Sequence, residues 1–527
     1  MNLYEMNIRD LLELRRREAP PKEFLLFEDQ VIKREEFDEM VNRVANGMLT
    51  LGIKKGDMVG VLLPNIPEFM YIFYAIAKLG AVIVPINTGY ASAPEELQYV
   101  IDHSEQKMIF TRSEFLKNIE SVKPSCPHLE RIINLGPEKG PIIISYSEMI
   151  EKASTELATT QVNPNELLGN FYTSGTTGRP KGVLLSHGAL IRGGEHIFNA
   201  IGARENDRAM AHFPLFHGNS LIYLNMGSLV TGCPLVIVDK FILDKFWERV
   251  KHYQVTIVSL MGSLMGMLLN KPETPDDHKN SLRAIISGIG SANYIEEFER
   301  RFCVTCIDSW ALTECTQGTV NFIDHIKDRK IGSIGWPAKN TEVKLVDDNG
   351  IEVPRGAVGE FILKGPAMFV GYLKDPEATK KTIRNGWLYT GDCGYQDEEG
   401  RFFFADRKKD MIKRKGENIA SAEVERALNS HPKILESAVI GVPDPEAGEE
   451  VKAYIILKPS ESLSPEEIID YCQKNLAYFK VPRYIEFRDH FPRPTAVPKV
   501  LKKALREERE DLTEGCYDRG PKLRLKS

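Results

Sequence analysis

Short apolar segments that alternate with helix-length segments constrain the fold of this chain more than any other feature. Residues 58–63 form one such segment, residues 67–79 have helical apolar spacing that ends at Gly80, and residues 81–86 are apolar again. Two strands joined by a helix are expected to be parallel and buried on both faces. The same alternation returns at residues 235–238, 255–260 and 284–286. The pattern predicts an α/β fold with doubly wound, mainly parallel sheets.

The pattern changes after Ile331. Three segments there alternate apolar and polar residues between Gly, Asp and Asn turns, at 342–347, 359–364 and 401–405. They predict an antiparallel β subdomain over about 331–405. Past residue 407 a charged stretch precedes a helix, two strands and a helix, at 421–429, 438–442, 451–457 and 464–475. We therefore expect a large domain over residues 1–407 and a small α+β domain over residues 408–527.

Charge and composition exclude several classes of function. The 527 residues include 68 Lys and Arg against 74 Asp and Glu, a net charge of −6. That balance gives no overall basic charge of the kind that drives nonspecific binding to nucleic acid or anionic membranes, so any basic function must be local. No segment offers the roughly 18 apolar residues of a transmembrane helix, and the first residues lack a signal-peptide pattern, so we expect a cytoplasmic protein.

Eight Cys are scattered along the chain. Only Cys303 and Cys306 have a suggestive spacing, and because no second pair lies near them we expect buried thiols rather than a metal site.

The segment Thr173-Ser174-Gly175-Thr176-Thr177-Gly178-Arg179-Pro180-Lys181 is the most informative motif. Its glycines free backbone N–H groups to converge, its hydroxyls are donors and its Lys is a cation, all of which suit polyphosphate oxygens. It is not the common P-loop, because Gly175 and Gly178 are three apart and Lys181 follows Arg-Pro. The ordinary alternative is a hydroxyl-rich surface turn. The segment predicts a phosphate-binding loop.

This loop resembles the phosphate-binding signature of the adenylate-forming superfamily, which includes acyl- and aryl-CoA synthetases, peptide-synthetase adenylation domains and beetle luciferases. The resemblance extends over roughly residues 10–505. It implies a small C-terminal domain that is mobile and turns about a hinge. It also implies that ATP phosphates are bound by loop residues that include a catalytic threonine, Thr176, and six others: Thr173, Ser174, Gly175, Thr177, Gly178 and Lys181.

The segment from Asp308 to Glu314 resembles the family motif Tyr-Gly-x-Thr-Glu. The resemblance implies that Trp310 stacks on adenine and that Asp308 reads the adenine amine. It also implies that Thr313 contacts phosphate and Glu314 binds Mg²⁺, an ion that needs only one or two carboxylates beside phosphate oxygens. Ala311 stands where the family usually has Gly. The ordinary alternative is a core Trp and a surface Glu.

Two further motifs resemble the family's ribose-binding and hinge segments. Asp392, in Tyr389-Thr390-Gly391-Asp392, would accept both ribose hydroxyls, and Arg407 would add a ribose or phosphate contact. Lys409 falls at the family's hinge. Three neighbouring cations fit an ordinary solvated loop at least as well as a functional role: Lys408, Arg414 and Lys415.

The last motif, residues 493–502, resembles the segment whose Lys bridges the carboxylate and the α-phosphate during adenylation. Lys499 takes that catalytic role by resemblance, although Pro498 replaces the usual Gly and stiffens the loop. His217 would gate the seam between acyl pocket and thiol tunnel, with a structural His as the alternative. Gly288 would line adenine and the acyl pocket. On the second face of the small domain, Lys413 and Gly416 would meet coenzyme A.

The resemblance implies an ATP-dependent acyl-CoA ligase that uses a carboxylic acid, ATP, Mg²⁺ and coenzyme A, with AMP and pyrophosphate as products. Residues 411–418, 246–250 and 479–482 are most similar to crotonobetaine/carnitine-CoA ligases and related fatty-acid-CoA ligases. Two alternatives remain open: delivery of the acyl group to a carrier protein or an amine, and a non-catalytic ligand-binding relative. The family also allows a homodimer.

Overall fold

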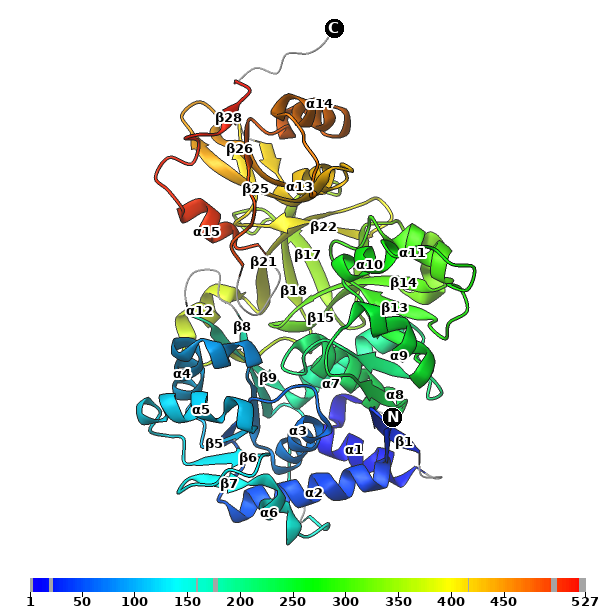
Figure 1. The fold of residues 1–527 in the computed structure, drawn as a ribbon, viewed down its shortest axis with the longest axis vertical. Coiled ribbons are helices and arrows are strands. Elements are labelled where there is room, and N and C mark those ends of the chain that lie inside the picture. The colour runs from blue at the N-terminus through cyan, green and yellow to red at the C-terminus, as the bar shows by residue number, and fades with distance from the viewer. Residues whose placement is uncertain are drawn as a thin grey trace. The chain divides into compact units, whose positions relative to one another are not determined.

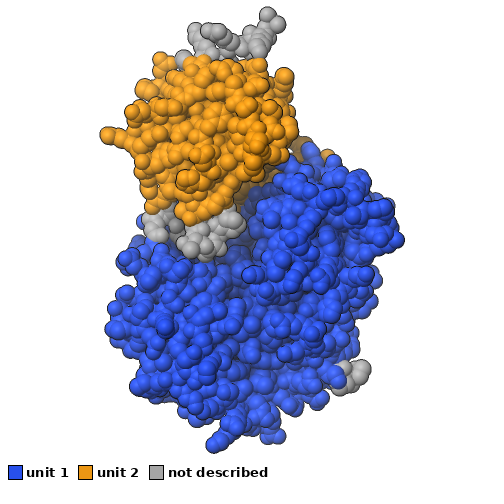
Figure 2. Space-filling view, in the orientation of Figure 1, with its two compact units in different colours: residues 1–343, 363–389 blue, residues 344–362, 390–527 orange. Residues whose placement is uncertain are grey.

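The computed structural model describes residues 3–18, 22–157, 160–173, 179–415, 417–493 and 500–520. The chain forms two compact units (Figure 2). Unit 1 comprises Met1–Val343 and Leu363–Tyr389, and unit 2 comprises Lys344–Ile362 and Thr390–Ser527. Residues 344–362 and 390–407, which the sequence analysis places in the first domain, lie in unit 2. The domain boundary at residue 407 and the hinge at Lys409 stay predictions. Among the described helices, none has both the length and the apolar character to cross a membrane.

The first sheet of unit 1 confirms the expected parallel pairing (Figure 1). Its order is β19-β9-β8-β4-β3-β5-β6-β7. Neighbouring strands from β8 to β7 are parallel, whereas β9 is antiparallel to both of its neighbours, β8 and β19. The strands are β3 (Met58–Val61), β4 (Val82–Pro85), β5 (Met108–Thr111), β6 (Arg131–Asn134), β7 (Ile143–Ser145), β8 (Leu167–Thr173), β9 (Lys181–Ser186) and β19 (Gly371–Tyr372). Helices α4 (Pro94–His103) and α5 (Ser113–Val122) contribute to one buried apolar cluster with β5 and β6.

The second sheet of unit 1 has the order β16-β15-β14-β13-β12-β10-β11-β1-β2. Its strands are β1 (Glu23–Phe27), β2 (Gln30–Lys33), β10 (Ala209–Ala211), β11 (Leu235–Ile237), β12 (Ile257–Ser259), β13 (Ala284–Ser287), β14 (Thr305–Leu312), β15 (Cys315–Val320) and β16 (Ser333–Pro337). Three helices pack their apolar residues against its middle, namely α9 (Phe246–Tyr253), α10 (Gly262–Leu269) and α11 (Ile295–Phe302). The predicted doubly wound α/β architecture is confirmed.

Local signals set the limits of α3 (Pro67–Leu79), which are the predicted ones. Pro67 occupies the first turn, where its missing N–H costs nothing. Gly80 ends the helix in the left-handed region with a φ of 66°, and its N–H donates to the carbonyls of Ile76 and Ala77. A side chain at this position would be strained.

The β subdomain and the small α+β domain both appear in the structure. Most of the β subdomain lies in unit 2. Its strands pair in the order β17 (Glu342–Val346), β18 (Gly359–Lys364), β21 (Trp387–Gln396) and β22 (Phe402–Arg407). The second is a sheet with the order β24-β23-β26-β27-β28, in which β25 also pairs with β26. Its strands are β23 (Ile412–Arg414), β24 (Glu417–Ile419), β25 (Ile434–Asp444), β26 (Gly448–Leu457), β27 (Tyr484–Phe487) and β28 (Tyr517–Asp518).

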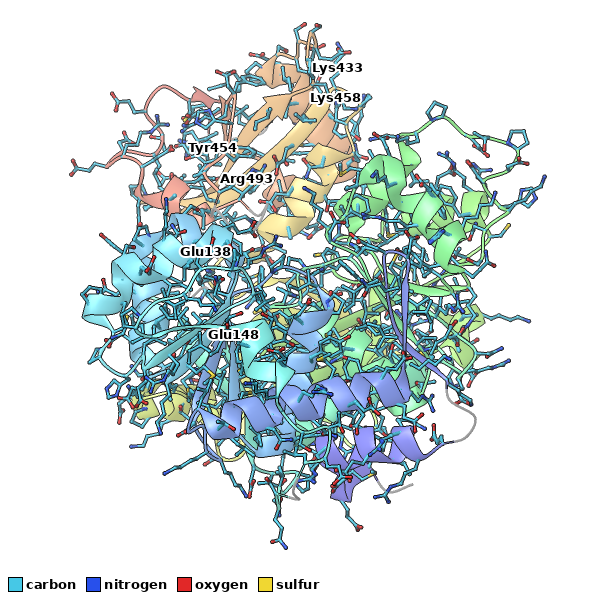
Figure 3. The ribbon with its side chains drawn as sticks, turned by 60° about the horizontal axis from the view of Figure 1, so that its bottom comes forward. Glu138, Glu148, Lys433, Tyr454, Lys458 and Arg493 are labelled. Atoms are coloured by element: carbon cyan, nitrogen blue, oxygen red, sulfur yellow. The ribbon has the colours of Figure 1, made fainter. Side chains whose placement is uncertain are left out.

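Helices α13 (Ser421–Asn429), α14 (Pro465–Asn475) and α15 (Lys502–Glu507) complete unit 2. The Tyr454 side chain, labelled in Figure 3, connects β26 with α15, because its hydroxyl lies 3.0 Å from Glu508 Oε1 and 3.4 Å from the Leu505 carbonyl. Ser464, the expected start of the helix, is the N-cap of α14, and its side chain accepts from the Glu467 N–H. The limits of α13 are the predicted ones.

One charged side chain has surroundings that the sequence did not indicate. Arg414 is buried, and its guanidinium donates to both carboxylate oxygens of Glu450, at 2.7 and 2.9 Å. The solvated-loop interpretation of Arg414 is therefore wrong. Both groups are charged and nearly inaccessible, so each depends on the other for compensation.

We predict that Glu450→Ala lowers the free energy of unfolding by about 3 to 5 kcal/mol, because it leaves the Arg414 charge buried without its carboxylate. Glu352→Ala is the matched control. It removes an exposed pair with Lys344 at 2.9 Å, and we expect it to cost at most about 1 kcal/mol. Urea unfolding of both variants checks this, and equal losses would contradict the account.

Candidate functional site

Asp308 lies where the parallel pairing of β13 with β14 ends, within β14. Residues Ser287 of β13 and Asp308 of β14 are direct partners in the sheet, and the Ser287 hydroxyl donates to Asp308 Oδ1 at 2.5 Å. Burial raises the pKa of Asp308 to about 6, against the opposing effects of the Ser287 hydrogen bond and of Arg329. A carboxyl group with such a pKa changes protonation near neutrality and can either accept from or donate to a nucleotide base.

The other residues of this motif follow along the same strand. Trp310 is buried, with 3% of its surface exposed. Gly288 follows Ser287 directly, and the atom of the described residues nearest to a Cβ placed there would be the Ser309 carbonyl oxygen, at 3.9 Å. Thr313 lies in the turn between β14 and β15. The adenine-binding roles of these residues stay predictions.

The phosphate-loop motif connects two antiparallel strands. Thr173 ends β8 and Lys181 begins β9, and the two residues are paired across the hairpin. Five residues of the predicted phosphate-binding loop lie outside the described residues: Ser174, Gly175, Thr176, Thr177 and Gly178. The described ends of the hairpin place Thr173 and Lys181 at the base of the loop.

Tyr372 connects two of the predicted site residues. Its hydroxyl donates to Glu314 Oε1 at 2.8 Å, and the Lys181 ammonium lies 4.9 Å from the centre of its ring. Lys181 Nζ is also 4.0 Å from Asp375 Oδ2. Burial and the neighbouring Glu314 carboxylate both raise the pKa of Tyr372, so the hydroxyl keeps its proton and stays a donor. Glu314 and Lys181 are therefore brought together around one ring.

The sequence analysis missed Tyr372. It reaches the site because β19 pairs with β9, with Tyr372 opposite Val183. This pairing joins segments almost 190 residues apart, and no local pattern signals it. The only sequence signal is the dipeptide Gly371-Tyr372, in which Gly371 has a φ of 156°.

The donor set around Glu314 fits one particular use of a divalent cation. Within the described ranges no group of three or more His, Cys, Asp or Glu side chains could hold a metal by itself. A single carboxylate beside Lys181 of the phosphate-loop motif fits a Mg²⁺ ion that keeps its waters and arrives with nucleotide phosphates. The residues present thus fit Mg²⁺ as the companion of a nucleotide.

His217 is exposed, in the loop after β10. Its Nδ1 accepts from the Asn219 N–H at 3.2 Å, which assigns the proton of the neutral ring to Nε2. The Asn219 amide in turn donates to Ser259 Oγ at 2.9 Å, at the carboxyl end of β12. His217 is therefore positioned by a hydrogen bond, and its role as a gate stays a prediction.

Unit 2 brings together the predicted ribose-binding pair. Asp392 of β21 and Arg407 of β22 are partners in the sheet, and Arg407 Nε lies 2.8 Å from Asp392 Oδ1. Lys413 is exposed, with Nζ 3.5 Å from Asp348 Oδ2. Gly416 and Lys499 lie outside the described residues.

Comparison with known families and proteins agrees with this arrangement. Residues 12–373 match the AMP-binding enzyme family, and residues 423–499 match the AMP-binding enzyme C-terminal domain. The crotonobetaine/carnitine--CoA ligase of Salmonella typhi is 34% identical over 481 residues, which cover 89% of this chain and 92% of that protein.

Solved structures agree with the family match. The anthranilate CoA ligase AuaEII, in complex with anthranoyl-AMP, has a TM-score of 0.88 at 29% identity, over 96% of this chain and 99% of that one. ATP-bound MatB from Rhodopseudomonas palustris has a TM-score of 0.87 at 28% identity, over 97% and 100%. The o-succinylbenzoate CoA synthetase MenE from Bacillus subtilis, with its acyl-adenylate intermediate OSB-AMP, has a TM-score of 0.83 at 29% identity, over 96% and 99%.

We predict that Tyr372→Phe lowers the rate of ATP-dependent pyrophosphate release about 10-fold to 100-fold. The reason is that a hydrogen bond to a charged acceptor, here Glu314, contributes about 1.5 to 3 kcal/mol. Tyr253→Phe is the control, since it removes a hydroxyl that donates to the Glu28 carbonyl at 3.1 Å, outside this cluster. Equal rates for Tyr372→Phe and the control would show that the contact to Glu314 has no function.

We predict that Asp308→Asn changes the pH dependence of stability. The folded pKa of about 6 exceeds the ordinary 3.8, so the stabilisation from protonation is complete below pH 3.8 and is lost as pH rises through 6. The asparagine side chain of the variant does not titrate, so the variant does not lose stability in this way as the pH rises. Its free energy of unfolding relative to wild type should therefore rise by about 2.4 kcal/mol between pH 4 and pH 8, because each pKa unit is worth about 1.4 kcal/mol and a small part of the effect is already lost at pH 4. Urea unfolding at both pH values measures it, and parallel pH profiles would refute the burial effect.

Proposed function

Because this chain belongs to the AMP-binding enzyme family, we propose that it is an ATP-dependent acyl-CoA ligase. It activates a carboxylic acid as acyl-AMP with release of pyrophosphate and then transfers the acyl group to coenzyme A. The observation in this chain that supports the proposal is the pair Glu314 and Lys181, held around the Tyr372 ring beside the phosphate-loop motif. The similar structures with ATP, anthranoyl-AMP or OSB-AMP give the same chemistry independent support.

In the first step a carboxylate oxygen of the acid attacks the α-phosphorus of ATP. The bond from that phosphorus to the bridging oxygen breaks, and pyrophosphate leaves with the electron pair. This chain supplies no nucleophile. Its contribution is to place the two reactants in line and to stabilise charge on the phosphates.

The named residues divide that work. Lys181 and the hydroxyls of Thr173, Thr176 and Thr177 bind the departing diphosphate, together with the loop residues Ser174, Gly175 and Gly178. Thr313 contacts phosphate, and Lys499 bridges the acid and the α-phosphate as negative charge grows between them. Asp308, Trp310 and Gly288 bind adenine, while Asp392 and Arg407 bind ribose. Mg²⁺, held by Glu314, would neutralise phosphate charge.

In the second step the thiol of coenzyme A attacks the acyl carbon, and AMP leaves with the oxygen that the acid contributed. We assign Lys413 and Gly416 to coenzyme A and His217 to the gate between acyl site and thiol. A rotation of the small domain about Lys409 would separate the two steps. A cytoplasmic location and a homodimer stay predictions.

The function is tested by pyrophosphate release from ATP and Mg²⁺ with a panel of short, long, branched, aromatic and betaine acids. We expect release to depend on an acid, and turnover to depend on coenzyme A. Acid-dependent release that coenzyme A does not change would favour a carrier protein or an amine as acceptor. No release with any acid would contradict the ligase.

Lys499→Ala should separate the two half-reactions. We predict that acyl-AMP formation falls at least about 100-fold, because charge stabilisation in the transition state is lost, while thioester formation from supplied acyl-AMP is nearly unchanged. The two rates are measured separately in single turnovers. Equal loss of both would contradict the role of Lys499.

A further inference from the structure

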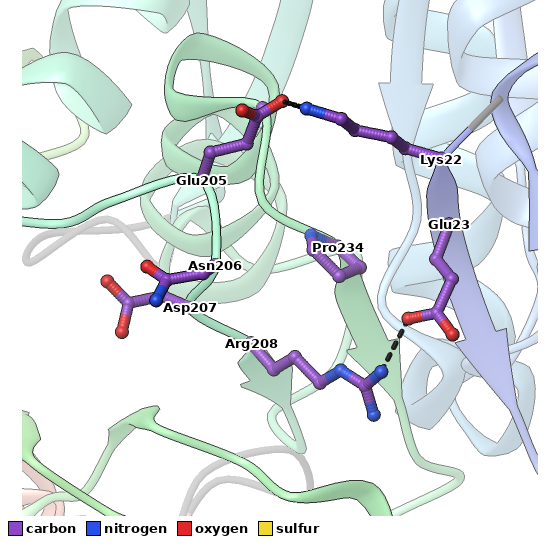
Figure 4. Close-up of a pocket in the computed structure, with 8 residues that line it drawn as sticks. Lys22, Glu23, Glu205, Asn206, Asp207, Arg208 and Pro234 are labelled. Carbon is purple, nitrogen blue, oxygen red and sulfur yellow. Dashed lines mark hydrogen bonds and ion pairs between the residues drawn. The ribbon is translucent and has the colours of Figure 1, made fainter. Parts of the chain in front are cut away.

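The larger of two cavities in unit 1 has its polar groups satisfied. It measures about 340 Å³ and lies at the amino ends of β1, β10 and β11. Figure 4 shows its charges paired across it, with Lys22 bonded to Glu205 and Arg208 Nη2 2.6 Å from Glu23 Oε2. These charges already have partners, so the cavity gives no indication of a ligand.

The smaller cavity, of about 120 Å³, lies between α7 (His187–Ala200) and β15. His196 and Gln317 line it. One polar atom of each, His196 Nε2 and Gln317 Oε1, has no hydrogen-bond partner among the described residues. Both atoms are almost fully enclosed by protein, so this cavity gives no indication of a ligand either.

The carboxyl end of α4 (Figure 1) carries a cluster of rings beside the phosphate-loop motif. Tyr99 and His103 lie one turn apart on the helix, and their rings are stacked, with centres 5.0 Å apart and planes at 23°. The ring of Tyr172, from β8, meets both edge-on, at 6.3 and 5.9 Å. Tyr99 and Tyr172 also pack against the buried apolar cluster that α4 shares with β5 and β6. The rings are therefore supported by a packed core.

This cluster holds the residue directly before the phosphate-loop motif. The Tyr172 hydroxyl lies 2.7 Å from His103 Nδ1, and Thr173, the first residue of the motif, follows Tyr172. Burial, and after it the charge of Lys374, lowers the pKa of His103, so the ring is neutral at pH 7. Burial raises the pKa of Tyr172, so its hydroxyl keeps its proton. A neutral pair of this kind fixes position and brings no charge to a phosphate.

The same rings hold the other end of the motif. Arg179 is the next described residue after Thr173, and its guanidinium carbon lies 5.2 Å from the centre of the Tyr99 ring. A cation at that distance is attracted by the face of the ring. Lys181 follows two residues later and begins β9. Both described ends of the motif are thus attached to one helix.

A third contact joins the end of α4 to the residues around Glu314. Glu105, two residues after His103, has Oε1 2.7 Å from Lys374 Nζ. Lys374 in turn lies two residues after Tyr372, whose hydroxyl donates to Glu314. Three segments of the candidate site that are far apart in sequence therefore meet at the end of α4.

We propose that Tyr99 and His103 are positioning residues for the phosphates of ATP: they hold both ends of the phosphate-loop motif in the arrangement that binds nucleotide. Fixing the two ends of a segment lowers the entropy that it loses when it closes on a ligand, so affinity rises without a new contact to that ligand. This inference rests on the proposed function, in which the motif binds the departing diphosphate.

The test measures the dissociation constant of MgATP by calorimetry and KM for ATP in pyrophosphate release. Tyr172→Phe removes one oxygen atom, and His103→Leu removes the nitrogen that faces it. We expect each variant to weaken MgATP binding about fivefold to tenfold and to raise KM for ATP to match, because the motif is less well organised before the nucleotide binds. The double variant should bind no more weakly than the weaker single variant, since both changes remove the same bond.

Two further variants separate positioning from folding. His103→Asn places an amide, which can donate or accept, near the position of Nδ1, and should bring the affinity to within about twofold of wild type. Tyr99→Leu removes the ring beneath Arg179 and should weaken MgATP binding about threefold or more.

His431→Leu is the matched control. Burial also lowers the pKa of His431, and its neutral ring meets the Tyr471 ring edge-on at 4.7 Å, in unit 2. We expect this variant to bind MgATP as wild type does.

Three results would overturn the positioning role: unchanged affinity in Tyr172→Phe or Tyr99→Leu, a loss in His103→Asn as large as in His103→Leu, or an equal loss in His431→Leu. A merely structural role would lower the free energy of unfolding of these variants and leave their affinity for MgATP unchanged. Wild type that binds MgATP but releases no pyrophosphate with any acid would reject the ligase function alone, because the affinities still test the positioning role. Wild type that does not bind MgATP would reject both.

Discussion

Parallel pairing of β10, β12, β13 and β14 is the constraint on which the rest of the site depends. In a parallel ladder every strand ends at the same edge, so residues far apart in sequence meet there without any contact between their own segments. Ser287, the last residue of β13, pairs with Asp308, where the parallel part of β14 ends, and Asn219 reaches Ser259 at the end of β12. One edge of the sheet thus collects side chains that the sequence presents as separate motifs.

Burial at that edge has an electrostatic consequence. A carboxyl group that loses water is easier to protonate, and the Ser287 hydroxyl only partly opposes this effect at Asp308. Tyr372 is affected in the same direction, so its hydroxyl remains a donor to the Glu314 carboxylate. Burial therefore keeps the Tyr372 hydroxyl a donor and brings the protonation of Asp308 close to neutral pH.

Local signals made much of the fold predictable. Pro67 and Gly80 fix the ends of α3 by their own backbone restrictions, and a run of apolar residues such as 82–85 needs only burial to become a central strand. The same reasoning could not find Tyr372, because β19 joins β9 through backbone pairing across most of the chain. Arg414 was misjudged for a related reason. Its neighbours in sequence are charged, whereas its partner Glu450 comes from another strand.

The site shows the same division between local and distant information. Asp392 and Arg407 were predicted separately from their motifs, and the register of β21 and β22 makes them a pair. No motif marks His196 or Gln317, and only the packing of helix 187–200 on β15 shows that the two residues line one cavity. Such groups are visible only after each hydrogen bond has been assigned.

The central claim is that the acid is activated on the α-phosphate of ATP, and an isotope experiment tests it most directly. The acid is labelled with oxygen-18 in its carboxylate, and AMP is recovered after turnover with coenzyme A. The account predicts AMP that carries one labelled oxygen, because the carboxylate oxygen that attacks phosphorus leaves with AMP. One labelled oxygen stays in the acyl carbonyl in any case; AMP without label, with the second labelled oxygen in inorganic phosphate instead, would contradict the account.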